Sequence, residues 1–160
     1  MSKSIQAIPA GREGLIPHLV CDPCREAIAF YKQAFGAEEV FSLPGPDGRV
    51  MHAEIRVGKN FIFLADDFPE YCGGHSQSPK GLKGTPVTIH SYVENCDAAI
   101  QKAVDAGATI LMPAGDAFWG DRYGAVTDPF GHKWSFGTHQ RELTPAELEK
   151  AMNEAFAQQA

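Results

Sequence analysis

The 160-residue sequence predicts an α+β fold in which two tandem βαβββ modules form a curved, barrel-like mixed sheet with helices outside, followed by a C-terminal helix. Three observations predict it. A segment that begins at His18 recurs at His90, each copy continues into an amphipathic helix that ends at a glycine, and short strands separated by tight turns follow each helix.

The internal repeat sets the domain organisation. Residues 18–28 and 90–100 align without a gap at an offset of 72, and the first histidine, one cysteine, one alanine and the last isoleucine coincide. Repetition of one supersecondary unit indicates that two similar modules pack into a single domain. We expect module one at 14–66, a linker at 67–84, module two at 85–139 and a terminal helix at 143–157.

Both expected module helices stop at a glycine. In the first, Asp22 is the expected N-cap, Pro23 stands in the first turn, and Gly36 can take the left-handed conformation that ends a helix. The second helix ends in the same way at Gly107. The side chains expected in the core from the two helices are Ala27, Ile28, Tyr31, Ala34, Phe35, Ala99, Ile100, Ala103 and Val104.

Runs of β-branched and aromatic residues between turn residues predict four strands in each module. In module one they are 14–20, 39–43, 49–57 and 61–66, and in module two they are 86–93, 109–112, 122–127 and 133–138. The linker is rich in Gly, Pro and Ser, so it is a candidate mobile lid. In the third strand, His52 and Glu54 alternate with apolar residues, so both lie on one face of the strand. That face lines a cavity, where the pair could act as acid and base, or it faces the solvent.

A capping box opens the terminal helix. Thr144 and Glu147 stand at capping-box spacing, and Pro145 occupies the first helical position. An apolar stripe follows at helical spacing and consists of Leu148, Ala151, Met152, Ala155 and Phe156. Such a stripe needs a partner, which is either the body of the domain or a second copy of the chain.

The composition excludes several functional classes. Lys and Arg total 14 against 20 Asp and Glu, a formal net charge of −6 without a basic run, so nucleic acids and anionic membranes are not expected partners. No stretch has the pattern of a secretory signal or a membrane span, so the four cysteines are expected as reduced thiols in a cytoplasmic protein. Cys21 and Cys24 have CxxC spacing, but no second pair completes a zinc site. We expect no organic cofactor.

Four motifs in a specific order carry a family resemblance. They are the stretches 27–37, 98–108, 118–124 and 128–134. With these motifs, the chain resembles the vicinal oxygen chelate superfamily, the glyoxalase/bleomycin-resistance/dioxygenase group, over residues 14–139. The resemblance implies paired modules around a cavity for a small organic ligand. It also implies a homodimer, because relatives frequently build the cavity across two chains.

The resemblance further implies a divalent-metal site with a histidine on the first strand and a carboxylate on the last strand of each module. Here the corresponding positions hold Ile16, Thr88, Phe63 and Ser135. The usual four ligands are therefore missing. His18 and His90 lie two residues further along the first strands and so on the same faces. They either contact the ligand directly or form a shifted divalent-metal site with Glu54 or His52.

Three neighbouring residues complete the expected ligand site. Trp119, Arg122 and Tyr123 offer an aromatic wall, a guanidinium for an anionic oxygen and a phenol donor, although nearby glycines also suit a structural loop. The expected ligand-binding residues are His18, His52, Glu54, Phe63, His90, Trp119, Arg122, Tyr123 and Ser135. His75 and His132 are expected at the surface, and no role is assigned to His139.

Three functions follow from these observations. The first is binding of a small organic compound without a metal ion, which Phe63 and Ser135 in place of carboxylates favour. The alternative is a metal-dependent glyoxalase-like lyase or isomerase with a shifted site around His18 and His90. The third is an interaction module that uses the C-terminal helix.

Overall fold

The computed structural model describes residues 5–158. Module one contains β1 (His18–Val20), α1 (Cys24–Phe35), β2 (Glu38–Pro44), β3 (Val50–Val57) and β4 (Asn60–Ala65). Module two contains β5 (Thr88–Tyr92), α3 (Cys96–Asp105), β6 (Thr109–Asp116), β7 (Asp121–Thr127) and β8 (Lys133–His139). The connection holds a 3-10 turn, η1 (Pro69–Tyr71), and α2 (Pro79–Leu82), and α4 (Pro145–Ala157) follows module two.

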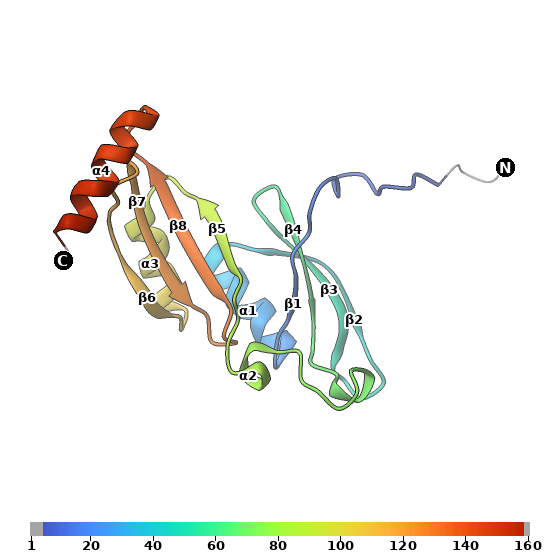
Figure 1. Ribbon diagram of the computed structural model, residues 1–160. Coiled ribbons are helices and arrows are strands. Elements are labelled where there is room, and N and C mark those ends of the chain that lie inside the picture. The colour runs from blue at the N-terminus through green and yellow to red at the C-terminus, as the bar shows by residue number, and fades with distance from the viewer. Residues whose placement is uncertain (1–4, 159–160) are drawn as a thin grey trace.

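The two modules have the same topology. The strand orders are β1-β4-β3-β2 and β5-β8-β7-β6, with the first strand of each module parallel to the last and the other neighbours antiparallel. This identity confirms the predicted repeat of βαβββ units. The strands form two separate four-stranded sheets, which do not close into a barrel (Figure 1).

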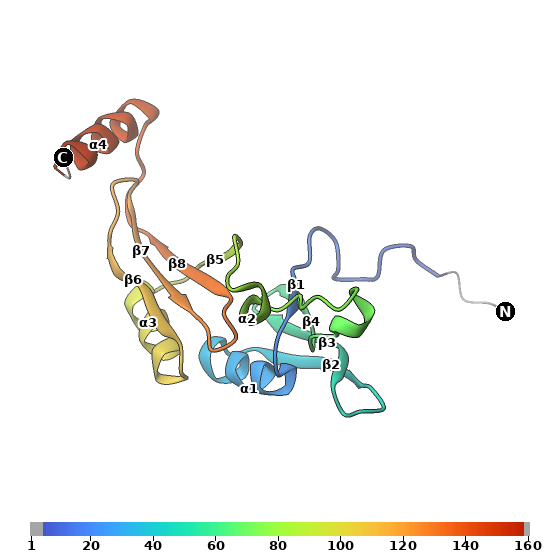
Figure 2. The same ribbon diagram turned by 60° about the horizontal axis from the view of Figure 1, so that its bottom comes forward.

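Helices α1 and α3 lie on one side of the two sheets. They contact each other, and α3 also contacts β6, β7 and β8, while α1 contacts β2 and β3. Figure 2 shows the two helices side by side below the sheets. We call the other face of each sheet, which neither helix covers, its open face.

Helix α1 begins one residue later than predicted. Asp22 is not its N-cap, because Pro23 holds that position in an extended conformation and makes no side-chain cap. The Cys24 amide instead donates to one carboxylate oxygen of Asp66 at 2.8 Å, and the Val50 amide donates to the other at 2.6 Å. A carboxylate that follows β4 therefore replaces the local cap, so the sequence around the helix start did not reveal it.

The core joins the two modules through a buried tyrosine. Tyr31 of α1 is fully buried, and its hydroxyl donates to Asp128, in the turn between β7 and β8, at 2.7 Å. The Trp134 indole donates to the same carboxylate at 2.9 Å. Most helix residues expected in the core are buried, and the three that are only partly buried are Phe35, Ala99 and Val104.

Side chains around the end of β1 are deeply buried. Cys21 and Cys24 are free thiols there, and burial raises the pKa of Cys24 to about 12. His132 is buried too, which shows that its expected surface position was wrong. Its Nε2 lies 2.9 Å from the Val20 carbonyl oxygen, because the turn between β7 and β8 folds back onto β1.

Several strand ends differ from the prediction. β1 has only three ladder residues, since the preceding Pro17 has no amide to donate to a neighbouring strand. β6 is longer than predicted and contains register shifts between Ile110 and Met112 and between Met112 and Gly115. Such bulges let the strand continue past Pro113, which cannot donate to the ladder.

Helix α4 stands away from the rest of the molecule (Figures 1 and 2). Its predicted capping box is confirmed, with Thr144 and Glu147 each accepting from the other's backbone amide. None of its residues is buried, and its nearest aromatic contact joins the rings of Phe156 and Phe118, 6.4 Å apart. The body of the domain therefore leaves the apolar stripe largely uncovered. Within residues 5–158, the helices are all too short or too polar to pass through a lipid bilayer.

Candidate functional site

The open face of module one carries His18, His52 and Phe63. In the strand register His18 lies opposite Phe63. The His18 ring centroid is 6.2 Å from those of His52 and Phe63, and the latter two centroids are 4.9 Å apart. Partial burial and, to a smaller extent, nearby His52 lower the pKa of His18. The imidazole is therefore mainly neutral at neutral pH, so it can both donate and accept hydrogen bonds.

Glu54 on the same face is paired with Arg12, which is not among the residues predicted from the sequence. Arg12, from the segment before β1, donates from Nε to Glu54 at 3.1 Å, and its guanidinium lies 4.1 Å from the centre of the Phe61 ring. His52 Nε2 lies 3.6 Å from the other carboxylate oxygen. The hydrogen bond from Arg12 holds the pKa of Glu54 below its usual value. The carboxylate is thus ionised and already paired.

The open face of module two holds the equivalent histidine in a different setting. His90 Nδ1 lies 2.8 Å from Oγ of Ser135, its cross-strand neighbour in β8. The imidazole stacks on Tyr123 with the centroids 5.9 Å apart, and it meets Tyr92 edge-on at 4.9 Å. A Cβ at Gly137 would lie 3.2 Å from both His90 and Tyr92. The glycine therefore makes room for these two rings.

His52 and Tyr123 occupy equivalent positions in the two modules. In module one, Phe63 pairs with Glu54 of β3, and His52 lies two residues before Glu54. In module two, Ser135 pairs with Ala125 of β7, and Tyr123 lies two residues before Ala125. Because side chains alternate along a strand, this spacing puts both rings on the open faces. Each module thus presents a first-strand histidine beside a second ring.

Trp119 and Tyr123 extend the open face of module two toward a buried carboxylate. Their rings lie 5.4 Å apart, and Trp119 is 38% exposed. Asp121 accepts hydrogen bonds from Trp119 Nε1 and the Tyr92 hydroxyl, both at 3.1 Å, and from His139 Nδ1 at 2.7 Å. Burial acts to raise the pKa of Asp121, but these bonds outweigh it and lower the pKa. Asp121 is not among the residues predicted from the sequence, although alternation from Tyr123 places it on the same face.

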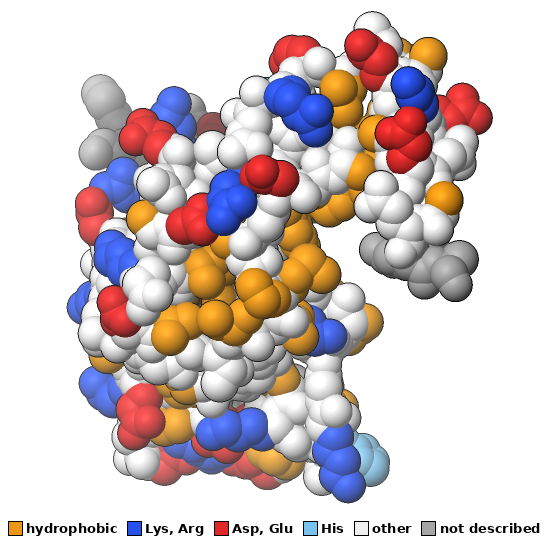
Figure 3. Space-filling view, turned by 90° about the vertical axis from the view of Figure 1, so that its left-hand side faces the viewer, with side chains coloured by type: hydrophobic (Ala, Val, Ile, Leu, Met, Phe, Trp, Pro, Cys, Tyr) orange, Lys and Arg blue, Asp and Glu red, His pale blue; other side chains and the backbone are white. Residues whose placement is uncertain are grey.

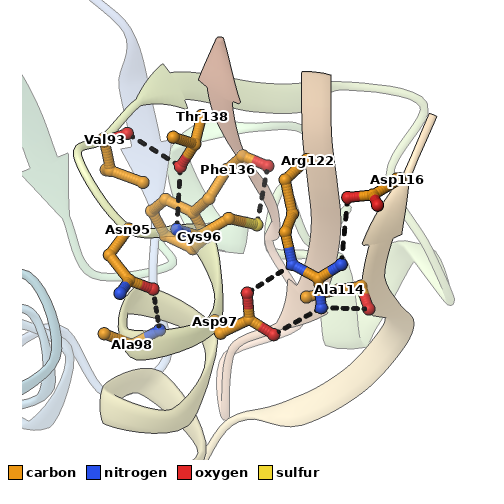
Figure 4. A network of polar contacts seen from close by, with 10 residues as sticks. All are labelled: Val93, Asn95, Cys96, Asp97, Ala98, Ala114, Asp116, Arg122, Phe136 and Thr138. Atoms are coloured by element: carbon orange, nitrogen blue, oxygen red, sulfur yellow. Dashed lines mark hydrogen bonds and ion pairs between the residues drawn. The ribbon is translucent and has the colours of Figure 1, made fainter. Parts of the chain in front are cut away.

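Arg122 lies on the opposite face of β7 from Tyr123. Its guanidinium donates to both carboxylate oxygens of Asp97 in α3, at 2.5 and 2.8 Å, and to Asp116 at 3.1 Å (Figure 4). Neighbouring strand residues point to opposite sides, so Arg122 and Tyr123 are separated by the sheet itself. The structure therefore brings the other expected residues onto open faces, whereas Arg122 ties α3 to the edge of its sheet.

The donor groups on the open faces do not fit a divalent metal ion. Within residues 5–158, no three His, Cys, Asp or Glu side chains are grouped closely enough to hold one. The cross-strand neighbours of the two histidines are Phe63 and Ser135, which offer no carboxylate. His18 and His90 themselves belong to separate sheets. The shifted site considered around these histidines and Glu54 is therefore not assembled.

A groove with a volume of about 800 Å³ is lined by residues of both modules and of the linker. It lies between β1 and the segment that leads into β5, with α2 beside it. Its lining is mainly apolar and includes Leu15, Pro17, Leu19, Leu82 and Val87. The volume is in the range of pockets for small molecules. His18 lines this groove but His90 is not among its lining residues, so the two histidines do not share the groove.

Comparison with known proteins supports one family. A family model described as the Glyoxalase/Bleomycin resistance protein/Dioxygenase superfamily matches residues 16–136. An uncharacterized protein of Mycobacterium tuberculosis is 50% identical over 139 residues, which cover 87% of this chain and 82% of that protein. An uncharacterized protein of Arabidopsis thaliana is 30% identical over 129 residues, which cover 74% of each chain.

Solved structures share the fold. The X-ray structure of a gene product from Arabidopsis thaliana has a TM-score of 0.62 and 29% identity, over 78% of this chain and 97% of that chain. The crystal structure of a protein from Pseudomonas aeruginosa has a TM-score of 0.63 and 27% identity, over 79% of this chain and 98% of that chain. With its repeated βαβββ topology and a family match over most of its length, the chain belongs to the Glyoxalase/Bleomycin resistance protein/Dioxygenase superfamily.

Proposed function

We propose that this protein binds a small organic molecule against the open faces of its sheets, without a resident metal ion. The observation that carries the proposal is the pair of equivalent histidines, His18 and His90, each exposed and each beside a second ring. Rings with a few directed hydrogen-bonding groups are the usual lining of small-molecule sites. Membership of a superfamily whose proteins bind small molecules adds support.

A metal-dependent lyase or isomerase reaction has less support. Lewis-acid catalysis needs several convergent ligands with open coordination positions. The residues opposite the two histidines are Phe63 and Ser135, and Glu54 is paired with Arg12. These contacts favour a site that recognises its ligand by packing and hydrogen bonds.

A ligand screen with matched histidine variants tests the proposal. Native mass spectrometry of freshly purified protein and a thermal-shift screen of small organic compounds identify a ligand. We expect the double variant His18→Ala, His90→Ala to lose most of the ligand-induced shift, because both faces lose a ring and a hydrogen-bonding group. His75→Ala is the control, since this exposed histidine lies in the linker. Full ligand-induced stabilisation of the double variant contradicts the proposal.

We also propose that a second copy of the chain covers part of the open faces. Large apolar side chains are 37–62% exposed on the edge strands and on α4, namely Phe41, Leu43, Ile110, Leu111, Met112, Leu148, Met152 and Phe156. Figure 3 shows hydrophobic side chains gathered on the side of the molecule where β6 and α4 lie, with a hollow under the helix. Patches of this kind on a single chain commonly mark an interface. Their presence on the equivalent strands β2 and β6 suits a symmetric homodimer.

Measurement of molar mass in solution tests the dimer. We expect light scattering to report a dimer for the wild type and a monomer for Met112→Glu, because Met112 is exposed on the open face of β6. Tyr71→Glu is the matched control, since Tyr71 is exposed in the linker and lies outside both sheets. A wild type that is monomeric at high concentration contradicts this proposal without affecting the ligand-binding one.

A further inference from the structure

One end of the open face of module two carries a second polar cluster, centred on His139 and Asp121. The two residues are cross-strand neighbours in β7 and β8. The side chain of Asp121 is 5% exposed, that of His139 is 48% exposed, and the His139 Nδ1 lies 2.7 Å from an Asp121 oxygen. Because the buried carboxylate accepts the Nδ1 proton, the Nε2 side of the imidazole is left for other partners.

The backbone around this pair is closely packed. The amides of Gln140 and Arg141 both donate to the Gly120 carbonyl oxygen at 3.0 Å. Gly120 has a φ of +100°, and a Cβ there would lie 2.5 Å from the Arg141 carbonyl oxygen. The turn before β7 is thereby fastened to the end of β8. The position of His139 is therefore defined by main-chain contacts as well as by its own hydrogen bond.

His139 Nε2 already holds a carboxylate in this structure. An oxygen of Glu142 lies 3.2 Å from it, and the Glu142 side chain is 95% exposed. An exposed ion pair of this kind contributes little stability, so another anion can replace it at small cost. The position of Glu142 shows that a carboxylate can lie within ion-pairing distance of Nε2.

Two aromatic side chains share the Asp121 carboxylate with His139 as their hydrogen-bond acceptor. Tyr92 and Trp119 both donate to Asp121, and they are 64% and 38% exposed. Their rings continue the aromatic surface formed by His90 and Tyr123. A ligand that reached Nε2 with an anionic group would therefore place its apolar part against aromatic faces.

We propose that His139, oriented by Asp121, anchors the carboxylate of a small aromatic acid, which displaces Glu142 from Nε2 and packs its ring against Tyr92 and Trp119. This inference rests on the proposed ligand-binding function and names the chemical class of its ligand. Asp121 does not repel the ligand strongly, because the imidazolium form of His139, 2.7 Å away, offsets its negative charge.

The charges that face His139 make this anchor sensitive to pH. They come from Asp121 of β7 and Glu142 after β8, and the Tyr92 hydroxyl of β5 bonds to the same Asp121. The hydrogen bond to Asp121, followed by that to Glu142, raises the pKa of His139 above its ordinary value of 6.5. The imidazolium form donates to an anion, so binding should weaken as the pH rises through this raised pKa, while the carboxylate of the ligand stays ionised.

Calorimetric titration of the full-length protein with 2-naphthoate, and with neutral 2-naphthamide as its isostere, tests the anchor. We expect the wild type to bind naphthoate roughly five-fold more tightly than naphthamide. His139→Gln should abolish this preference, because it removes the positive charge. Glu142→Gln should tighten naphthoate binding by removing the competing carboxylate. His75→Gln is the control variant and should behave as the wild type.

Each result decides the proposal. It is overturned if the wild type shows no preference for naphthoate, if His139→Gln keeps the preference, or if Glu142→Gln leaves naphthoate affinity unchanged. Glu142→Gln alters an exposed side chain, so it tests the anchor even if His139→Gln folds poorly. If other ligands still depend on His18 and His90 while naphthoate does not depend on His139, the proposed function stands and only this inference fails.

Discussion

The two open faces share one backbone plan but differ in the way their polar groups are arranged. In module one, His18 lies near a pairing of His52, Glu54 and Arg12, so charged groups stand close to the histidine. In module two, His90 is surrounded by uncharged groups of serine and tyrosine side chains. The carboxylate of that module is buried at the end of the face and bonded to His139.

This difference shows that two modules with the same topology in one chain need not have the same chemistry. The register places a side chain at each equivalent position, but the side chain itself is free to change. Position 63 is a phenylalanine where the second module has Ser135, and position 52 is a histidine where it has Tyr123. Around the two histidines, the face of module one therefore offers charged groups beside its rings, whereas that of module two offers hydroxyl groups and rings without charge.

The largest effect is expected for the buried carboxylate of module two. Asp121→Ala leaves three donors without their acceptor, so we expect the free energy of unfolding to fall by about 2 kcal/mol. Urea unfolding followed by circular dichroism measures it, with Asp121→Asn as a control that keeps one acceptor. An unchanged unfolding midpoint for Asp121→Ala would show that the buried carboxylate of module two does not stabilise the protein.

The contributions of His139 and His18 to stability should respond to pH in opposite directions. The pKa of His139 is raised above 6.5, so its contribution to stability is present below pH 6.5 and is lost as the pH rises through the raised pKa. The pKa of His18 is lowered, so its contribution is present above pH 6.5 and is lost as the pH falls through the lowered pKa. Unfolding free energies of His139→Gln and His18→Gln, subtracted from the wild type at each pH, isolate the two contributions.

Histidine titration by NMR provides the check on this pH prediction. We expect His18 to titrate below its ordinary value of 6.5 and His139 above it. A higher pKa for His18 than for His139 would contradict the difference in electrostatic environment between the two modules.

A smaller effect is expected for the carboxylate of module one. Glu54→Ala breaks the pair with Arg12, but both side chains are partly exposed, so the loss should be below about 1 kcal/mol. The same urea experiment measures it, and Arg12→Ala should give a similar loss because it breaks the same pair. A loss for Glu54→Ala as large as that for Asp121→Ala would contradict the contrast between a surface pair and a buried cluster.

The smallest effect is expected from divalent metal ions. A metal that binds the native state raises the midpoint of thermal unfolding by mass action. Because no three metal-binding side chains are grouped on either open face among residues 5–158, we expect Zn²⁺, Ni²⁺, Mn²⁺ and Fe²⁺ to leave the midpoint unchanged. A saturable rise that His18→Ala removes would restore the metal-dependent alternative.

Strand periodicity predicted the face on which several of the expected residues lie. The alternation that placed His52 and Glu54 on one face of β3 is confirmed by the complete burial of Ala53 and Ile55 on the other. The same rule applied to β7 would have separated Arg122 from Tyr123. Asp121 and His139 escaped notice because they lie far apart in sequence and meet only through the pairing of β7 and β8.

Local sequence pattern by itself determined the type and order of most elements of the two modules. The helix end at Gly36 and the capping box at Thr144 depend on residues within a few positions of each other. Such interactions are made inside one turn or one strand, so the chain order alone specifies them.

Only the tertiary structure decided which distant groups meet. It set Asp66 on the start of α1, Arg12 on Glu54 and His139 on Asp121, and it left the sheets separate. These pairings depend on how strands from different parts of the chain pack in three dimensions, and a buried or half-buried polar group takes whichever partner that packing brings within hydrogen-bonding distance. Periodicity predicts the face on which a side chain lies, but not the partner that it finds there.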